Sequence, residues 1–216
     1  MADVLSGLGL INGIVHQMKQ EIMNASWMIA VGLLMTFSGL LHKNESFARW
    51  DARIFQIIHI RLCRYAGFFQ YIRPLGTGPV SILMILIMYI SSWEFGVIAT
   101  FSYIIAAVIE RIIKLSIRRP RPYQILPKVN MGQLPEPHDP SHPSGDSFRV
   151  WFLAILFPVA FSLPGPFIVL SFLSAIILSI GRIALGVHYP LDVISGTGLG
   201  FLFSSIAIFS FQMIMN

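Results

Sequence analysis

The chain has 216 residues, of which 55% are hydrophobic and only 12% are charged. That charged fraction is about half of the ~25% found in a typical soluble domain. Together with a mean hydropathy of +0.72, it argues strongly against a cytosolic globular fold. The net charge of +5 is gathered in a few clusters, so nucleic-acid binding is not indicated. A single cysteine, Cys63, excludes an intrachain disulfide framework and a cysteine metal site.

Long uncharged runs dominate the chain, and most approach or exceed the ~20 residues that cross a bilayer. These runs are Ile22–Leu41, Pro74–Trp93, Phe95–Ile109, Val150–Gly181 and Val193–Asn216. The run from Val150 is too long for one crossing and is interrupted by Pro164, Gly165 and Pro166, so it predicts two helices joined by a tight turn. We therefore predict an all-α, polytopic membrane protein with six transmembrane helices in one domain, residues 1–216.

Three segments outside these runs complete the predicted organisation. Residues 1–21 are mixed and weakly amphipathic, which predicts an N-terminal interfacial helix and not a secretory signal. Residues 43–73 combine arginines with aromatic and aliphatic residues, which suits an interfacial linker or a helix packed on the bundle. Residues 115–146, rich in proline, predict an irregular loop that caps one membrane face. Six spans place residues 43–73, this loop and the turn before Pro190 on one membrane face.

Ionisable residues at that face are the candidate functional groups, because such groups are costly at membrane depth. Lys114 and Arg121 flank the end of the third span, and Arg182 ends the fifth. Three cations at one place require an anion to offset their repulsion, and phosphate is the natural candidate. Arg118 and Arg119 are interpreted instead as anchors of a helix end at the lipid headgroups.

Two further features converge on the same chemistry. The stretch from Pro143 through Ser144, Gly145 and Asp146 opens the fourth span, so backbone N–H groups at a helix N-terminus point toward the anion. His188 precedes Asp192 by four residues, with Pro190 suited to the first helical position between them. The carboxylate can then hold one imidazole nitrogen and leave the other as a nucleophile.

These residues form a three-part pattern. Its parts are Lys114, six residues, Arg121-Pro122; then Pro143-Ser144-Gly145; then Arg182, five residues, His188, three residues, Asp192. The pattern resembles the signature of the type 2 phosphatidic acid phosphatase superfamily, which is related to the vanadium haloperoxidases. The resemblance covers the chain from about the first span to the sixth.

The resemblance implies a role for each matching residue. Phosphate oxygens would be bound by Lys114, Arg121 and Arg182, with Ser144 and Gly145 as further donors. His188 would attack phosphorus to form a phosphohistidine, and Asp192 would orient His188. Water would then hydrolyse the intermediate, without a metal or a cofactor.

Asp146 departs from the family pattern, which usually has a histidine there to protonate the leaving oxygen. An aspartate among cations at a helix N-terminus stays ionised and is a poor proton donor. Three interpretations follow. Asp146 acts as the acid in a closed site; His142 or His138 supplies the proton; or the leaving group needs little protonation, as in a diphosphate. We favour the third slightly.

The sequence thus predicts an integral membrane phosphatase for a lipid phosphomonoester or diphosphate, with membrane lipids as its other partners and no nucleic acid. Two alternatives are a lipid phosphotransferase using the same intermediate and a catalytically weakened lipid-phosphate binding protein. Basic residues near the site favour a cytoplasmic active site, whereas the resemblance favours the extracytoplasmic face of a cell or inner membrane. We favour the latter.

Overall fold

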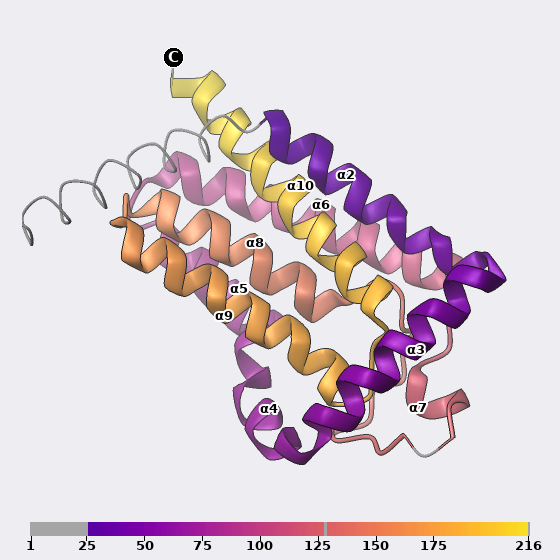
Figure 1. Ribbon diagram of the computed structural model, residues 1–216. Helices are drawn as coiled ribbons and strands as arrows, with labels where there is room; N and C mark the ends of the chain where they lie inside the picture. Colours follow the sequence, from indigo (N-terminus) through magenta and orange to yellow (C-terminus); the bar gives the residue numbers. More distant parts are fainter. Residues whose placement is uncertain (1–25, 128, 216) are drawn as a thin grey trace, which may run out of the picture.

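A long apolar helix, α10 (Pro190–Met215), runs through the middle of the molecule, with α2 on one side and α8 on the other (Figure 1). The computed structural model describes residues 26–127 and 129–215, so the predicted interfacial helix at residues 1–21 lies outside the described residues. Chain order is α2 (Ser26–Ser38), η1 (Gly39–Lys43), α3 (Glu45–Leu62), η2 (Cys63–Tyr65), α4 (Ala66–Ile72), η3 (Arg73–Gly76), α5 (Gly78–Met88), α6 (Trp93–Ile117), α7 (Pro122–Ile125), α8 (Gly145–Ala160), α9 (Gly165–Ala184) and α10.

Glycines let α10 approach both neighbours closely. A Cβ atom on Gly198 would lie 2.5 Å from the backbone nitrogen of Thr36 in α2, and one on Gly196 would lie 2.2 Å from the carbonyl oxygen of Ser144. Both separations are too short for a side chain, so α10 packs backbone against backbone, as small residues permit in membrane helices. The N-terminus of α8 is therefore fixed against the first turns of α10.

The chain turns where the sequence predicts it. The uncharged run from Val150 divides into α8 and α9, which are separated by the turn at residues 161–164. The third predicted span continues beyond Glu110 and Lys114 as α6, which is terminated by its C-cap Arg118 in a left-handed conformation (φ 50°). Because α6 includes residues 115–117 and α8 begins at Gly145, the irregular segment is shorter than the predicted loop at residues 115–146.

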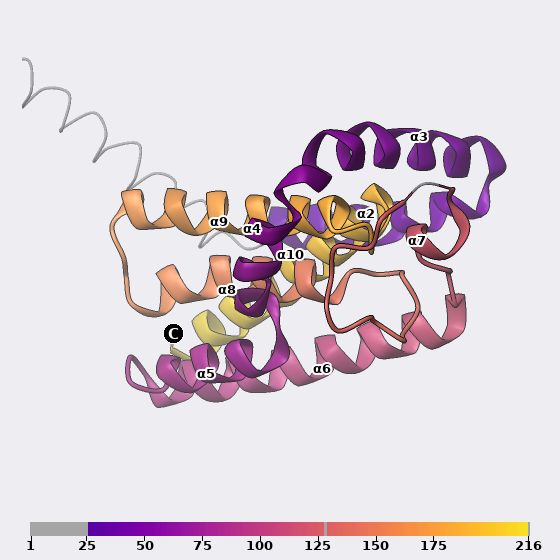
Figure 2. The same ribbon diagram turned by 90° about the horizontal axis from the view of Figure 1, so that it is seen from below.

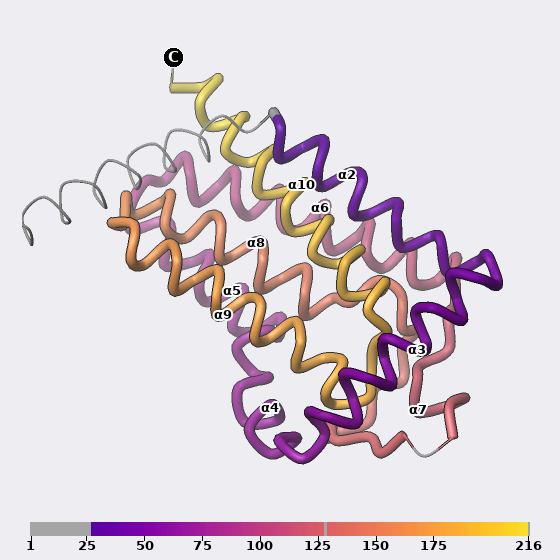
Figure 3. The backbone as a smooth tube through the Cα atoms, in the orientation of Figure 1, coloured from indigo at the N-terminus to yellow at the C-terminus, as the bar shows by residue number. Residues whose placement is uncertain are grey.

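One end of the bundle carries nearly all the connecting structure. Figures 1 and 2 show α3, α4, α7 and the loop that leads to α8 gathered at this end, while the C-terminus lies at the other. The tube in Figure 3 follows the sharp turn from α9 into α10 at the same end, beside α3. This arrangement brings the three ionisable parts of the sequence pattern together.

Helix α3 has two different faces. Its buried residues Asp51, Phe55 and His59 pack on the turn between α9 and α10, where the His59 Nδ1 atom lies 3.1 Å from the Ala184 carbonyl oxygen. Trp50 and Ile60 on the other face are exposed. The helix therefore packs on the bundle and also presents an apolar surface, while the interfacial location of residues 43–73 stays a prediction.

The sequence predicts six membrane crossings, but fewer of the described helices qualify as crossings by their length and composition. Among the described residues, three segments are long and apolar enough to span a bilayer: Trp93–Ile125, which begins with α6, then α9 and α10. A fourth is possible if Glu45–Gly76 and Gly78–Met88, bent by 45°, form one broken span. The helices α2, α5 and α8 have only 13, 11 and 16 residues, and α2 is continued by the five-residue 3₁₀ helix η1.

Candidate active site

A polar cavity of about 290 Å³ lies at the loop-covered end, between α6, α8, α9 and the proline-rich loop. Among the described residues, six cationic side chains line it: Arg73, Arg111, Lys114, Arg121, Arg149 and Arg182. The carboxylates lining it are Glu110, Asp139 and Asp146, which leaves a net charge of about +3 on the described lining. Such a cavity attracts a multiply charged anion.

The three cations of the sequence pattern converge on this cavity from different elements. Lys114 lies in the last turn of α6, Arg121 caps α7, and Arg182 lies in the last turn of α9. Lys114 pairs with Glu110 at 3.0 Å and also with Asp139. The Arg121 Nη1 atom donates to the Val187 carbonyl oxygen at 2.9 Å, and its Nη2 atom pairs with Asp139 Oδ1 at 2.8 Å.

Arg182 retains unused hydrogen-bonding capacity. Its Nη2 atom donates to Gln133 at 2.6 Å, but its Nε and Nη1 atoms are buried without a hydrogen-bond partner among the described residues. Nη1 lies 3.1 Å from Asp146 Oδ2, as an ion pair without hydrogen-bond geometry. Buried donors without partners are costly, so these two N–H groups are suited to an incoming anion.

His188 presents its Nε2 atom to the cavity, in the loop between α9 and α10. Nε2 lies 3.2 Å from the Arg121 Nη1 atom, which can only donate, so Nε2 carries the lone pair and Nδ1 the proton. Burial and the neighbouring Arg121 charge lower the pKa of His188 to about 3. The imidazole is therefore neutral near pH 7, with its Nε2 lone pair facing the cations.

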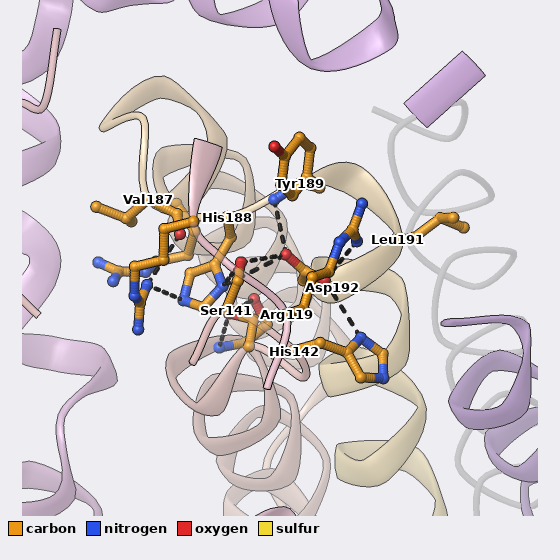
Figure 4. A network of polar contacts seen from close by, with 12 residues as sticks. Arg119, Ser141, His142, Val187, His188, Tyr189, Leu191 and Asp192 are labelled. Atoms are coloured by element: carbon orange, nitrogen blue, oxygen red, sulfur yellow. Dashed lines mark hydrogen bonds and ion pairs between the residues drawn. The ribbon is translucent and has the colours of Figure 1, made fainter. Parts of the chain in front are cut away.

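Asp192 lies behind His188 and is saturated with donors (Figure 4). Its Oδ2 atom accepts from Ser141 Oγ at 2.5 Å and from the Tyr189 backbone N–H at 2.9 Å. The His188 Nδ1 atom is 3.9 Å from this oxygen, beyond hydrogen-bond distance, and 3.5 Å from Ser141 Oγ. Ser141 therefore lies between the imidazole and the carboxylate, which the sequence pattern predicts to be in direct contact.

Arg119 corrects the sequence interpretation. It is only 8% exposed, where a headgroup anchor would be open to lipid, and its guanidinium bridges Asp192 Oδ1 and Asp51 Oδ2, each at 2.7 Å. A local signal exists, because a residue before proline is extended and side chains two apart in an extended stretch share a side. Arg119 and Arg121 flank Pro120 in this way. Arg118, in contrast, is exposed.

The start of α8 contributes to the cavity unevenly. Gly145 and Asp146 line it. The Ser144 side chain is fully buried and caps α8, with its Oγ atom 2.8 Å from Ser147 Oγ, and it is not among the residues that line the cavity. Asp146 is ion-paired with Arg182 and, at 3.5 Å, with Arg149.

The histidines considered as alternative acids lie elsewhere. His142 contacts Asp192 Oδ1 through Nδ1 at 3.2 Å, on the side opposite His188, and lines a separate cavity with Ile112 and Thr36. His138 is exposed and is not among the residues that line the polar cavity. Neither ring is placed to give a proton to a group bound beside His188.

The family model described as PAP2 superfamily matches residues 95–215, which is more than half of the chain and includes every residue of the three-part pattern. The chain belongs to the PAP2 superfamily. It is 27% identical over 162 residues to an undecaprenyl-diphosphatase of Sulfolobus acidocaldarius, covering 74% of this chain and 77% of that protein.

Two solved structures are similar to this PAP2 protein. A transmembrane PAP2-type phosphatidylglycerolphosphate phosphatase from Bacillus subtilis has a TM-score of 0.69 and 19% identity, with 88% of this chain and 97% of that chain covered. LpxE from Aquifex aeolicus has a TM-score of 0.64 and 27% identity, with 72% and 92% covered. The protein is therefore a multi-pass membrane lipid phosphatase of the PAP2 superfamily.

Proposed function

We propose that this PAP2 protein hydrolyses the terminal phosphate of a lipid diphosphate through a phosphohistidine at His188. The observation that carries the proposal is the His188 Nε2 lone pair, beside Arg121, in a cavity whose described lining has a net charge of about +3. A phosphomonoester brings a charge of about −1.5 to −2 near pH 7, which leaves cations unmatched. A second phosphate matches them better. The name of the Sulfolobus relative, an undecaprenyl-diphosphatase, supports the same substrate class.

The proposed reaction has two steps. His188 Nε2 attacks the terminal phosphorus, a P–N bond forms, and the bond to the bridging oxygen breaks with its electron pair leaving on the lipid monophosphate. Water then attacks the phosphohistidine, which returns His188 and releases inorganic phosphate. Lys114, Arg121 and Arg182 would hold the transferring oxygens, with Gly145 as a backbone donor. Asp192, through Ser141, would stabilise the imidazole as its Nε2 atom forms the bond.

A diphosphate substrate would explain how the enzyme works with Asp146 where the resemblance leads us to expect a histidine. A lipid alkoxide leaving group needs a proton in the transition state, whereas a phosphate leaving group is stable as an anion. The second phosphate would lie against Arg73, Arg111 and Arg149, the cavity cations outside the sequence pattern. Arg73 supports this placement because its Nε atom is buried without a hydrogen-bond partner among the described residues.

An apolar groove lies close to the cavity and suits the lipid chain. Asp146 and Arg182 also line a small void of about 10 Å³ between the two, together with Val150 and Leu178. Val150 and Leu178 in turn line a groove of about 190 Å³ between α5, α8 and α9. A lipid in this groove would place its headgroup at the cavity mouth and its chain toward the bilayer.

Phosphate release and enzyme phosphorylation test the proposal. Purified protein should release inorganic phosphate from a polyprenyl diphosphate without an acceptor; release that requires an acceptor would indicate a phosphotransferase. Phosphohistidine hydrolyses in acid, so the reaction is quenched rapidly into base. This quench should trap ³²P on the wild-type protein and not on His188→Ala. Normal turnover by a folded His188→Ala variant would disprove the assignment of the nucleophile, and an absence of turnover and trapping in wild type would favour a binding protein.

We further propose that α2, α5 and α8 also cross the membrane, giving six crossings, and that the cavity opens on the extracytoplasmic face. Single cysteines at Glu136 in the active-site loop and at Leu163 in the turn between α8 and α9, in a Cys63→Ser background, test this in intact cells. A membrane-impermeant maleimide should label position 136 and leave position 163 unlabelled. The reverse pattern would place the active site in the cytoplasm, and labelling of both positions or of neither would contradict the assigned topology.

A further inference from the structure

The proposed phosphate ligands Lys114 and Arg121 already hold an anion that belongs to the protein. The Asp139 carboxylate, in the proline-rich loop, pairs with Lys114 through Oδ2 and with the Arg121 Nη2 atom through Oδ1, the latter at 2.8 Å. Burial acts to raise the pKa of Asp139, but the two cations outweigh it and hold the pKa well below its usual range. Asp139 is therefore an ionised carboxylate that lines the cavity and occupies an anion position.

Both cations keep other contacts that fix them without the carboxylate. The Arg121 Nη1 atom donates to the Val187 carbonyl oxygen, and its Nε atom donates to the backbone oxygen of Asp139, each at 2.9 Å. Lys114 remains 3.0 Å from Glu110 Oε1. The Asp139 side chain is thus not required to position either cation, which argues against a purely structural role.

The carboxylate can leave while the loop stays in place. The Asp139 side chain is 34% exposed, so rotation about its own bonds can carry it to solvent. The backbone on either side is fixed, because the Ser141 N–H donates to the Arg119 carbonyl oxygen at 2.8 Å and the Tyr123 hydroxyl donates to the Pro137 carbonyl oxygen at 3.1 Å. Exchange of the carboxylate for phosphate therefore requires no movement of the loop.

We propose that Asp139 is an intramolecular competitor of phosphate. Its carboxylate leaves Lys114 and Arg121 when a phosphate group binds them, and it returns when inorganic phosphate dissociates. The inference rests on the proposed function, in which these two cations hold the transferring phosphate. One consequence is that Asp139 weakens the binding of substrate and product alike, and so limits inhibition by the product.

Titration calorimetry with inorganic phosphate, on purified protein in detergent, tests the competition. Asp139→Asn removes the competing charge while keeping the side-chain size. Because hydrogen bonds to charged groups are strong, losing them from the free state should lower the Kd for phosphate by about ten- to a hundredfold. Glu136→Gln is the matched control: it removes the same charge from the same loop at an exposed residue, and its Kd should stay within about twofold of wild type.

The outcomes separate this inference from the proposed function. If Asp139→Asn leaves the Kd unchanged or raises it, while Arg182→Gln abolishes binding, then the phosphate site stands and the competition is wrong. If Glu136→Gln lowers the Kd as much as Asp139→Asn does, the effect is one of net charge and the inference also fails. If phosphate binds to no variant, the proposed phosphate site fails and the inference with it. Asp139→Ser provides the same test should the asparagine variant not elute as folded protein in gel filtration.

Discussion

Arg119 joins the candidate active site to α3, and replacing it should reveal how strongly the two are coupled. Its guanidinium lies 2.7 Å from a carboxylate oxygen of both Asp51 and Asp192, and both carboxylates are fully buried. Arg119→Met keeps the length of the side chain but leaves two buried negative charges without their cation. Breaking a buried ion pair by removing one partner typically costs about 3–5 kcal/mol. At ~2–4 °C per kcal/mol for a chain of this size, the midpoint of thermal unfolding should fall by roughly 6–20 °C.

The neighbouring Arg118 supplies the matched control. Arg118 has the same charge one residue earlier but is exposed, so Arg118→Gln should change stability by less than about 0.5 kcal/mol. Thermal unfolding of both variants in the same detergent, followed by intrinsic fluorescence, gives the comparison. Adding Asp51→Asn to Arg119→Met should restore part of the loss, because one of the uncompensated charges is removed. Equal melting temperatures for Arg119→Met and Arg118→Gln would refute the reasoning.

Four further predictions concern the cavity and the His188–Asp192 pair behind it. Arg121→Lys and Arg182→Lys should each lower kcat/KM by about a hundredfold, since an ammonium cannot reproduce the planar contacts of a guanidinium; near-normal kinetics in both would mean that the pocket is misplaced. Ser141→Ala should lower kcat about tenfold with little change in KM, and Ser141→Thr, which restores the hydroxyl, should recover most of the lost kcat. An unchanged kcat for Ser141→Ala would mean that His188 does not need the hydroxyl to reach Asp192. Because burial and Arg121 lower the pKa of His188 to about 3, protonation of His188 should not reduce kcat/KM near pH 6.5. Any decrease in kcat/KM there should follow the titration of the substrate phosphate alone. For the same reason, unfolded protein binds the extra proton between about pH 6.5 and pH 3, so stability falls as pH is lowered through that window.

The sequence predicts the parts of this site that depend on local spacing. The uncharged runs and the turn at Pro164 determine which loops share an end of the bundle, and this is enough to bring Lys114, Arg121, Arg182 and His188 to one cavity. Each of these residues lies at or near a helix end whose position the run of apolar residues fixes. The predicted convergence needs no knowledge of side-chain contacts and is confirmed by the cavity lining, while the chemical roles of these residues stay predictions.

What the sequence does not predict depends on partners distant along the chain. Whether Arg119 faces lipid or protein is decided by Asp51, which lies in α3 and is brought near by the packing of Phe55 and His59. The contacts of Ser141 and Asp139 depend on how an irregular, proline-rich loop folds over the cavity. Such a loop has no periodicity from which to infer which side chains face the cavity. His142 is adjacent to the motif in sequence but lies on the far side of Asp192.

Asp146, which stands where the resemblance leads us to expect a histidine, offers a final test of the proposed substrate class. Asp146 forms ion pairs with Arg182 at 3.1 Å and with Arg149 at 3.5 Å, and an ionised carboxylate has no proton to give. Asp146→His should therefore raise the rate on a long-chain phosphate monoester, where general acid catalysis is worth ~10²- to 10⁴-fold, and change the rate on a polyprenyl diphosphate much less. The two substrates are compared for wild type, Asp146→His and Asp146→Ala across pH. A wild type that already prefers the monoester, together with an Asp146→Ala variant inactive on it, would identify Asp146 as the working acid. In that case, the argument from leaving-group chemistry to a diphosphate substrate would be wrong.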